Sequence, residues 1–294
     1  MTAEKDKILL LPDGRALGYA IHGPDDGVPV LGFHGIPGSR LQHPPDADIY
    51  RRYPVRLFLL ERPGIGLSSP SALRPVRCWA QDVAAFCTAL SLHRVAVLGI
   101  SGGGPYALAC ARLLPDRVAQ VSLVSALGPL AQPEYFRHLS PPARILFRLA
   151  ESFPLATRHL LQRRLRRMPA SPAEFAKTLH LRLHAADWAL LSRPEIAAML
   201  RRDVEESLRQ GAGALVHELR VQRMEWEFEG GEVAMPLHIY HGTADWLVKP
   251  EMALALHRDL PGSQLHLVPE GGHFMVLAQM QTIFSQIIQD IERG

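Results

Sequence analysis

The run from Val95 to Pro105 reads Val-Ala-Val-Leu-Gly-Ile-Ser-Gly-Gly-Gly-Pro. Its first half is short, apolar and β-branched, which predicts a strand buried on both faces. The alanine-rich segment Tyr106–Leu114 predicts a helix directly after the glycines. Ser101 lies at the junction, within the pattern Gly99-x-Ser101-x-Gly103. Between a strand and a helix this pattern is typical of a nucleophile elbow, in which the tight turn leaves no room for side chains at the flanking positions.

Such a turn would lift the Ser101 hydroxyl clear of the sheet and hold the backbone of this residue in a strained conformation. The hydroxyl would then lie beside the N-terminus of a helix, where free N–H groups favour negative charge. A lone pattern of this kind also arises by chance in glycine-rich loops that have only a structural role. The order of the surrounding elements therefore decides between the two interpretations.

The composition is that of an ordinary globular protein, because 47% of the 294 residues are hydrophobic and the formal net charge is only +3. So weak a charge gives no reason to expect a nucleic-acid partner. The three cysteines lack the spacing of a zinc or redox motif and are expected to be small core side chains in a reducing compartment. Residues 1–7 are polar, and no run reaches the roughly 18 apolar residues that span a bilayer. We therefore expect a cytoplasmic protein without a membrane span.

Apolar runs alternate with helical stretches at both ends of the chain. Ile8–Pro12 and Arg15–His22 flank Asp13-Gly14, a strong hairpin signal, and predict an antiparallel start. Helices are expected at about 76–92, 106–114 and 250–260, and from the last loop to about Ile291. This alternation predicts βαβ units and hence a mostly parallel sheet with helices on both faces. The remaining expected strands are Val28–Phe33, Val55–Leu60, Val118–Ser125, Leu237–Tyr240 and Gln264–Val268.

The alternation stops between residues 128 and 235, where several helical stretches follow one another without a strand. Prolines near their starts support helix entry, and apolar residues recur at helical spacing, as at Ile145, Leu146, Leu149 and Phe153. We therefore predict a core domain formed by residues 1–127 and 236–294, with residues 128–235 as an inserted helical cap. The expected cap helices are 142–153, 155–167, 172–186, 194–210 and 214–228.

Two further residues have the chemistry that a serine nucleophile needs. Asp245 follows one predicted strand and His273 follows the next, which gives the chain order Ser, Asp, His. Parallel strands place all three residues at the same edge of the sheet, where open α/β sheets bind ligands. His273 is expected to accept the Ser101 proton and later donate it, and Asp245 to orient the imidazole and stabilise its charged form.

An oxyanion formed at Ser101 needs two hydrogen-bond donors. The backbone N–H of Gly102 is one candidate, because it follows the nucleophile. The other is Ile36, in the loop after the third strand, since the neighbouring Pro37 has no N–H. Phe274, beside His273, is the candidate for a side chain that lines the substrate pocket.

Taken together, these motifs resemble those of the α/β-hydrolases, in particular the capped, esterase-like subgroup, over nearly the whole chain. The resemblance implies an eight-stranded sheet with a reversed second strand and a helical cap after the sixth. A serine at the elbow differs from the aspartate that relatives such as haloalkane dehalogenases and epoxide hydrolases have there. The matching segments are 34–38 (His-Gly-Ile-Pro-Gly), 61–68 (Glu-Arg-Pro-Gly-Ile-Gly-Leu-Ser), the elbow, 241–245 (His-Gly-Thr-Ala-Asp) and 270–274 (Glu-Gly-Gly-His-Phe).

The sequence thus predicts a carboxylesterase-like serine hydrolase that cleaves an ester, thioester or amide of a small molecule through an acyl-enzyme on Ser101. Its partner would be a small-molecule substrate with an acyl group, and nothing in the sequence fixes an oligomeric state. No cofactor is expected, since Gly64-Ile65-Gly66 lacks the rest of a dinucleotide fingerprint, and no metal, since His217-Glu218 lacks a second histidine. The same fold could instead serve a ligand-sensing or signalling protein with slow or no turnover, a lyase or a cofactor-free oxygenase.

Two histidines, one arginine and one arginine-rich segment can each be interpreted as structural or as functional. His34, His241 and Arg62 are expected to brace loops rather than to take part in catalysis. The segment Arg163–Arg167 contains four arginines and is expected to be a solvated helix face. The alternatives for this segment are a site for an anionic substrate and a contact with a membrane surface.

Overall fold

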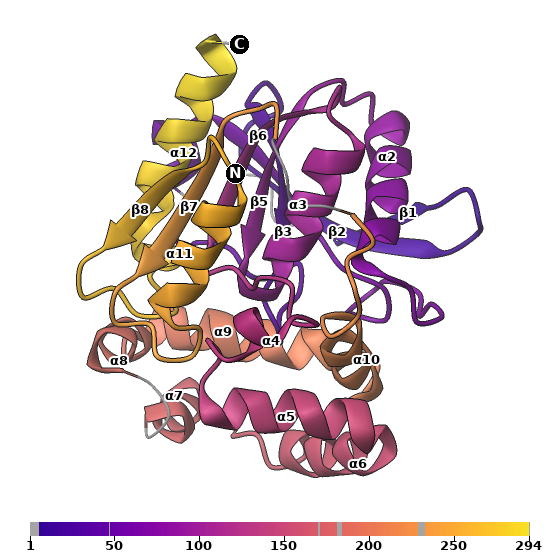
Figure 1. The fold of residues 1–294 in the computed structure, drawn as a ribbon, viewed down its shortest axis with the longest axis vertical. Coiled ribbons are helices and arrows are strands. Elements are labelled where there is room, and N and C mark those ends of the chain that lie inside the picture. The colour runs from indigo at the N-terminus through magenta and orange to yellow at the C-terminus, as the bar shows by residue number, and fades with distance from the viewer. Residues whose placement is uncertain (1–5, 47, 170, 181–183, 229–232, 294) are drawn as a thin grey trace.

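A single sheet of eight strands, in the order β1-β2-β4-β3-β5-β6-β7-β8, forms the centre of the protein (Figure 1). The computed structural model describes residues 6–46, 48–169, 171–180, 184–228 and 233–293. Strand β2 is antiparallel to both β1 and β4, and the other neighbouring strands are parallel. The predicted fold class, with its reversed second strand, is confirmed. The strands are β1 (Lys7–Leu10), β2 (Ala16–His22), β3 (Val28–Phe33), β4 (Val55–Leu60), β5 (Val95–Ile100), β6 (Val118–Val124), β7 (Leu237–Gly242) and β8 (Gln264–Val268).

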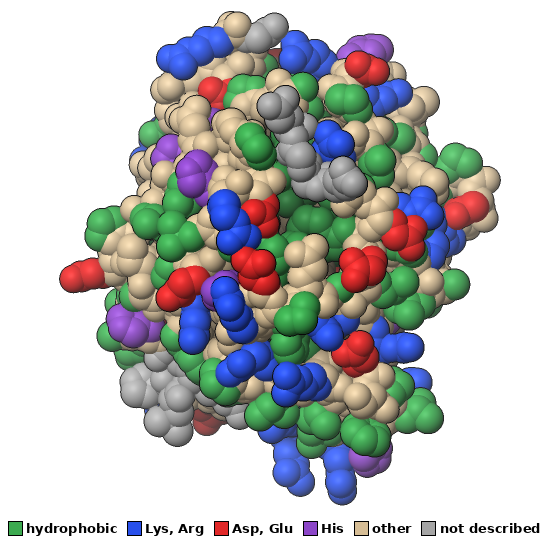
Figure 2. Space-filling view, viewed as in Figure 1, with side chains coloured by type: hydrophobic (Ala, Val, Ile, Leu, Met, Phe, Trp, Pro, Cys, Tyr) green, Lys and Arg blue, Asp and Glu red, His purple; other side chains and the backbone are tan. Residues whose placement is uncertain are grey.

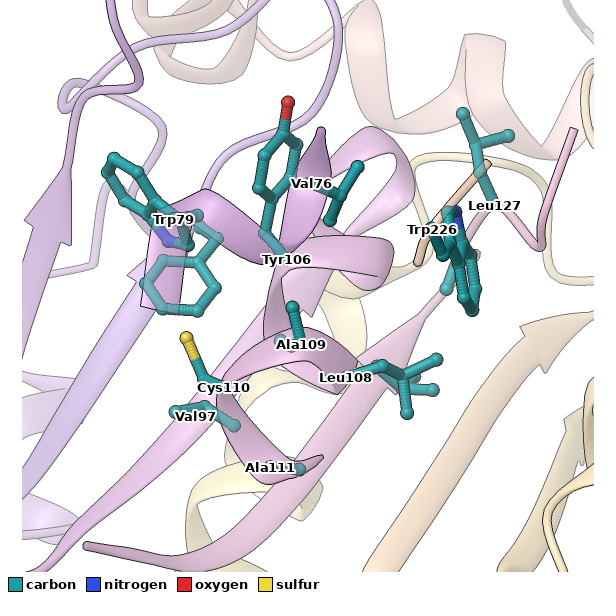
Figure 3. Packing of buried hydrophobic residues seen from close by; sticks show 14 of the residues in the cluster. Val76, Trp79, Val97, Tyr106, Leu108, Ala109, Cys110, Ala111, Leu127 and Trp226 are labelled. Carbon is teal, nitrogen blue, oxygen red and sulfur yellow. The ribbon is translucent and has the colours of Figure 1, made fainter. Parts of the chain in front are cut away.

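Two hydrophobic layers cover the two faces of the sheet. The first contains side chains of α2 (Trp79–Ala89), α3 (Gly104–Leu113) and α11 (Pro250–Asp259), and Figure 3 shows part of it around α3. The second contains side chains of α1 (Ile49–Arg52) and α12 (Val276–Arg293). Successive side chains of β5 enter opposite layers, as the pleat of a strand requires. Burial on both faces explains why this strand is apolar throughout.

Two of the three cysteines are core side chains, as the sequence predicts. Cys87 and Cys110 are buried, and burial raises the pKa of both thiols. Cys78 is partly exposed, and all three are free thiols. Figure 3 shows Cys110 on α3 close to Val97 of β5, where it acts as a small apolar side chain.

A helical insert separates β6 from β7, as predicted, and within the described residues it contributes no strand to the sheet. Figure 1 shows its helices beyond one end of the strands, with α5 and α6 farthest from the sheet. Residues 128–235 remain our proposal for its extent. Among the described residues, no helix has both the length and the apolar character needed to cross a bilayer. The insert contains α4 (Pro133–Phe136), α5 (Pro141–Ser152), α6 (Pro154–Leu165), α7 (Pro172–His180), α8 (Ala185–Leu191), α9 (Pro194–Ser207) and α10 (Gly213–Val221).

The insert also corrects some predicted boundaries. The single helix predicted over residues 172–186 is two helices, α7 and α8, and residues 181–183 lie outside the described residues. His184 has an extended backbone and its side chain accepts a hydrogen bond from the Ala186 N–H, so that it caps the start of α8. The predicted helix over residues 214–228 ends at Val221, and the one over residues 194–210 ends at Ser207, just before Gly211 with its positive φ of 90°.

Candidate active site

Ser101 lies in a sharp turn between β5 and α3, where the sequence predicts a nucleophile elbow. Its φ is 50°, in the left-handed region that a residue with a side chain rarely adopts. A Cβ atom on Gly99 would overlap the backbone of Gly103 and Gly104, and one on Gly103 would overlap the backbone of Phe33. The glycines therefore allow the turn to lie flat against the end of β3.

The structure brings the three predicted residues together in one hydrogen-bonded chain. His273 Nε2 lies 3.2 Å from Ser101 Oγ, and His273 Nδ1 lies 2.8 Å from Asp245 Oδ2. Asp245 follows β7 and His273 follows β8, so that parallel strands deliver both side chains to the edge where β5 ends. The distances are those at which a serine, a base and an orienting carboxylate can act in sequence.

Asp245 is held in place by the loop that it begins. Its Oδ1 accepts hydrogen bonds from the N–H groups of Leu247 and Val248, both at 3.0 Å, which leaves Oδ2 for His273. His241 lies beneath it, with Nε2 2.8 Å from the Val248 carbonyl and 3.4 Å from Asp245 Oδ2. The contacts of His241 are structural, in line with the sequence interpretation.

The buried pair has an electrostatic polarity suited to a general base. Burial alone would raise the pKa of Asp245, but the charge of His273 and hydrogen bonds from His241 and His273 hold it well below its usual range. Burial alone would lower the pKa of His273, but the charge and hydrogen bond of Asp245, with a further contribution from Asp187, raise it. Asp245 therefore stays ionised and increases the basicity of the imidazole.

The two predicted oxyanion donors, Ile36 and Gly102, lie close to each other beside Ser101. A Cβ atom on Gly102 would overlap the Ile36 side chain, which would have to shift to accept it. Among the described residues, the Ile36 N–H has no hydrogen-bond acceptor. Arg62 fixes the Ile36 loop from below, donating to the carbonyls of His34 at 2.7 Å and Gly35 at 3.0 Å. Arg62 thus braces the loop, as expected from its forked set of donors.

Two cavities meet at Ser101, and both are lined by Ile36 and Leu247. The first, of about 470 Å³, extends under α5, α6 and α10 and is lined almost entirely by aliphatic side chains. The second, of about 580 Å³, contains His273 and, as the sequence suggested, Phe274. Gln42 and Asp203 make its wall more polar. Of the two, only the second is lined by the histidine.

Asp187, on the insert helix α8, is a site residue that the sequence analysis missed. It is fully buried, and its two carboxylate oxygens accept the backbone N–H groups of His273 at 3.0 Å and Phe274 at 2.8 Å. A Cβ atom on Gly272 would overlap the carboxylate, so the loop approaches it as closely as it can. Burial raises the pKa of Asp187, while the two N–H groups favour its ionised form. The insert therefore fastens the loop that carries His273.

The acid limb of the pH–rate profile should report on this arrangement. Because only neutral imidazole can accept a proton, kcat/KM is expected to fall as the pH drops through the pKa of His273, which lies above the ordinary value of about 6.5. Asp187→Asn removes a negative charge near His273 and one of the two carboxylate oxygens that accept backbone N–H groups of the His273 loop. The acid limb should therefore move to lower pH, and kcat should fall roughly 10-fold because the loop loosens.

A pH series of kcat/KM for both proteins measures this shift. Loosening of the loop without an electrostatic effect would lower kcat and leave the acid limb in place. An unchanged acid limb would therefore show that Asp187 does not act on His273 through its charge.

A family model described as alpha/beta hydrolase fold matches residues 28–278. The non-heme chloroperoxidase of Streptomyces lividans is 38% identical over 120 residues, which are 40% of this chain and only 44% of that protein. A thermophilic esterase from Thermogutta terrifontis has a TM-score of 0.66 at 21% identity and covers 98% of both chains. The enol-lactonase from Burkholderia xenovorans LB400 has a TM-score of 0.71 at 17% identity over 97% of this chain and 100% of that chain. At these identities the two structures support the fold alone.

Proposed function

The chain belongs to the alpha/beta hydrolase fold family, and we propose that it is a serine hydrolase that cleaves a carboxylic ester, or a similar thioester or amide, of a small molecule. One observation carries the proposal: His273 lies within hydrogen-bond reach of both Ser101 Oγ and Asp245, in a site bordered by two cavities. A serine becomes a useful nucleophile only beside a base that can take its proton.

In the proposed reaction, Ser101 Oγ attacks the carbonyl carbon while His273 Nε2 accepts the hydroxyl proton. Asp245 stabilises the resulting imidazolium. The oxygen that gains negative charge accepts hydrogen bonds from the N–H groups of Ile36 and Gly102. His273 then donates its proton to the leaving oxygen as the bond to the acyl carbon breaks. Finally, His273 accepts a proton from a water molecule that attacks the acyl carbon, and it donates this proton to Ser101 Oγ as the acyl–oxygen bond breaks, which releases the acid and restores Ser101.

We infer where the two halves of the substrate would bind from the position of His273. Because His273 must protonate the leaving group, the alcohol is expected on the histidine side, in the cavity with Gln42, Asp203 and Phe274. The acyl chain then occupies the other cavity, whose aliphatic lining includes Leu146 of α5 and Leu219 of α10. We therefore propose an ester with an apolar acyl chain and a more polar alcohol as the substrate class.

A series of p-nitrophenyl esters with acyl chains of increasing length tests the proposal. Each methylene buried in the first cavity should raise kcat/KM by up to about fourfold, because burying a CH₂ group is worth about 0.8 kcal/mol. Leu146→Trp fills part of this cavity and should abolish the preference for longer acyl chains while acetate is still cleaved. Val204→Phe, in the second cavity, is the matched control and should instead alter the choice of alcohol.

Two results would count against the proposal. If Val204→Phe, rather than Leu146→Trp, abolished the preference for longer acyl chains, the acyl chain would bind in the second cavity and the alcohol in the first. If the wild-type protein turned over no ester of the series, it would not be an esterase, and a ligand-sensing role would be favoured.

A second candidate is favoured by a single comparison, the partial similarity to the S. lividans non-heme chloroperoxidase. That activity would replace a hydrogen of an organic substrate with chlorine, consuming hydrogen peroxide, chloride and a proton and forming two molecules of water. Incubation with hydrogen peroxide, chloride and a chlorinatable dione tests this candidate directly. Chlorination without ester turnover would favour it over the esterase, whereas ester turnover without chlorination would eliminate it.

A further inference from the structure

Residues 141–167 of the insert combine exposed arginines with large exposed apolar side chains. Residues 141–167, which comprise α5, α6, the residue between them and the two residues after α6, contain seven arginines and one glutamate, a local charge of +6. Because the formal net charge of the whole chain is +3, the remaining residues together carry −3. Figure 2 shows Lys and Arg side chains gathered toward the lower end of the molecule, where Figure 1 places α5 and α6. The positive charge is therefore concentrated in this segment of the insert.

These arginines are largely free to meet a partner. Arg158, Arg163, Arg166 and Arg167 are exposed, and among the described residues none of them pairs with a carboxylate. The single acidic side chain of the two helices, Glu151, is instead paired with Arg223, at 3.2 Å. Exposure alone fits the expected solvated helix face. A second observation is needed to distinguish a binding surface from a solvated one.

That observation is a set of large apolar side chains exposed on α5, on α6 and between them. The exposed fractions are 79% for Leu155, 61% for Phe153, 58% for Ile145 and 43% for Leu160. Leaving such side chains in water forfeits the free energy of burying them, so four of them within 16 residues favour an interaction surface. We call these four residues and the arginines of residues 141–167 together the outer cap face.

The outer cap face is continuous with the aliphatic cavity at Ser101. Ile145, Leu160 and Arg164 belong to the face and also line the cavity of about 470 Å³. Apolar side chains therefore lead from the surface to the cavity that we assign to the acyl chain. A molecule held against this face would lie at the entrance of the site.

We propose that the outer cap face binds the surface of an anionic lipid bilayer or micelle and receives the acyl substrate from it. Arginines attract anionic headgroups, and exposed leucine and phenylalanine enter the boundary between headgroups and acyl chains. A nucleic acid would satisfy the arginines but would offer no apolar environment to Leu155 and Leu160. The delivery of substrate, though not the binding itself, depends on the proposed esterase function.

Sedimentation with vesicles of phosphatidylglycerol and phosphatidylcholine tests the binding without any need for turnover. The wild-type protein should bind these vesicles, bind pure phosphatidylcholine at least 10-fold more weakly, and dissociate at high salt. Arg163→Gln with Arg167→Gln should weaken binding about 30-fold, because each basic residue near an anionic surface contributes about a factor of five. Phe153→Ser with Leu155→Ser should weaken it at least 10-fold.

Matched controls make the same changes elsewhere. Arg51→Gln with Arg52→Gln removes two exposed arginines of α1, and Leu254→Ser removes an exposed leucine of α11. Both controls should bind like the wild type, and all of these variants should hydrolyse a water-soluble acetate ester like the wild type. The proposal is wrong if the wild type does not bind anionic vesicles. It is also wrong if the variant with Phe153→Ser and Leu155→Ser binds them as tightly as the wild type. Binding by a protein that hydrolyses no ester would contradict the proposed function and leave this proposal standing.

Discussion

Ser101→Ala is expected to lower kcat for p-nitrophenyl butyrate by a factor of about 10⁴ to 10⁶. Serine and histidine act as a unit, so removing one of them costs about as much activity as removing both. Alanine keeps the backbone and the Cβ atom of the elbow, so the variant should fold with its two cavities intact. KM should change little, since the oxyanion donors and the cavity walls remain. Stopped-flow or long-incubation rates, compared with the uncatalysed reaction, measure the loss.

Ser125→Ala is the matched control for this variant. Ser125 follows β6 and, like Ser101, it is buried with a positive φ, of 47°, but its hydroxyl has no partner among the described residues. Its loss should leave kcat within about twofold of the wild type. A Ser101→Ala protein that retained a tenth of the activity would show that another residue is the nucleophile.

Asp245→Asn is expected to lower kcat by about 10⁴. The asparagine can still accept the N–H groups of Leu247 and Val248, so that the loop should stay in place. Its amide, however, donates where the carboxylate accepted, which favours the wrong tautomer of His273 and removes the charge that stabilises the imidazolium. The effect should therefore fall on kcat, with folding stability largely preserved.

Asp290→Asn separates this effect from the general loss of a buried Asp–His pair. Asp290 on α12 contacts the buried His238 of β7 at 2.8 Å and has no contact with the residues around Ser101 among its described interactions. The control should lower the melting temperature and leave kcat almost unchanged. A loss of less than 10-fold in Asp245→Asn would show that His273 does not depend on this carboxylate.

The central sheet and the Ser101, Asp245 and His273 cluster were predictable because each depends on local signals. The elbow needs glycines within two residues of the serine, and Asp245 and His273 each follow an apolar run directly. Parallel topology then brings the three together without knowledge of any long-range contact. The hairpin formed by β1 and β2 was likewise predicted by Asp13-Gly14, where Gly14 has a φ of 83°.

Features that depend on which helices pack together were not predictable. Asp187 is an acidic residue in the first turn of a helix, a common position with its own local explanation, and it contacts a loop 86 residues later in the chain. Whether Ile145 and Phe153 are buried was also not predictable from the sequence. Their spacing predicted α5 correctly, yet both side chains are exposed, because periodicity identifies an apolar face without indicating what covers it.

Covalent labelling tests the role of Ser101 most directly. The protein is treated with a fluorophosphonate, and its mass and its proteolytic peptides are compared with those of Ser101→Ala. We expect one adduct per chain, located on the peptide that contains Ser101, absent from Ser101→Ala and formed far more slowly in His273→Ala. Labelling of a different residue, or equal labelling of wild type and Ser101→Ala, would contradict the assignment of Ser101 as the nucleophile.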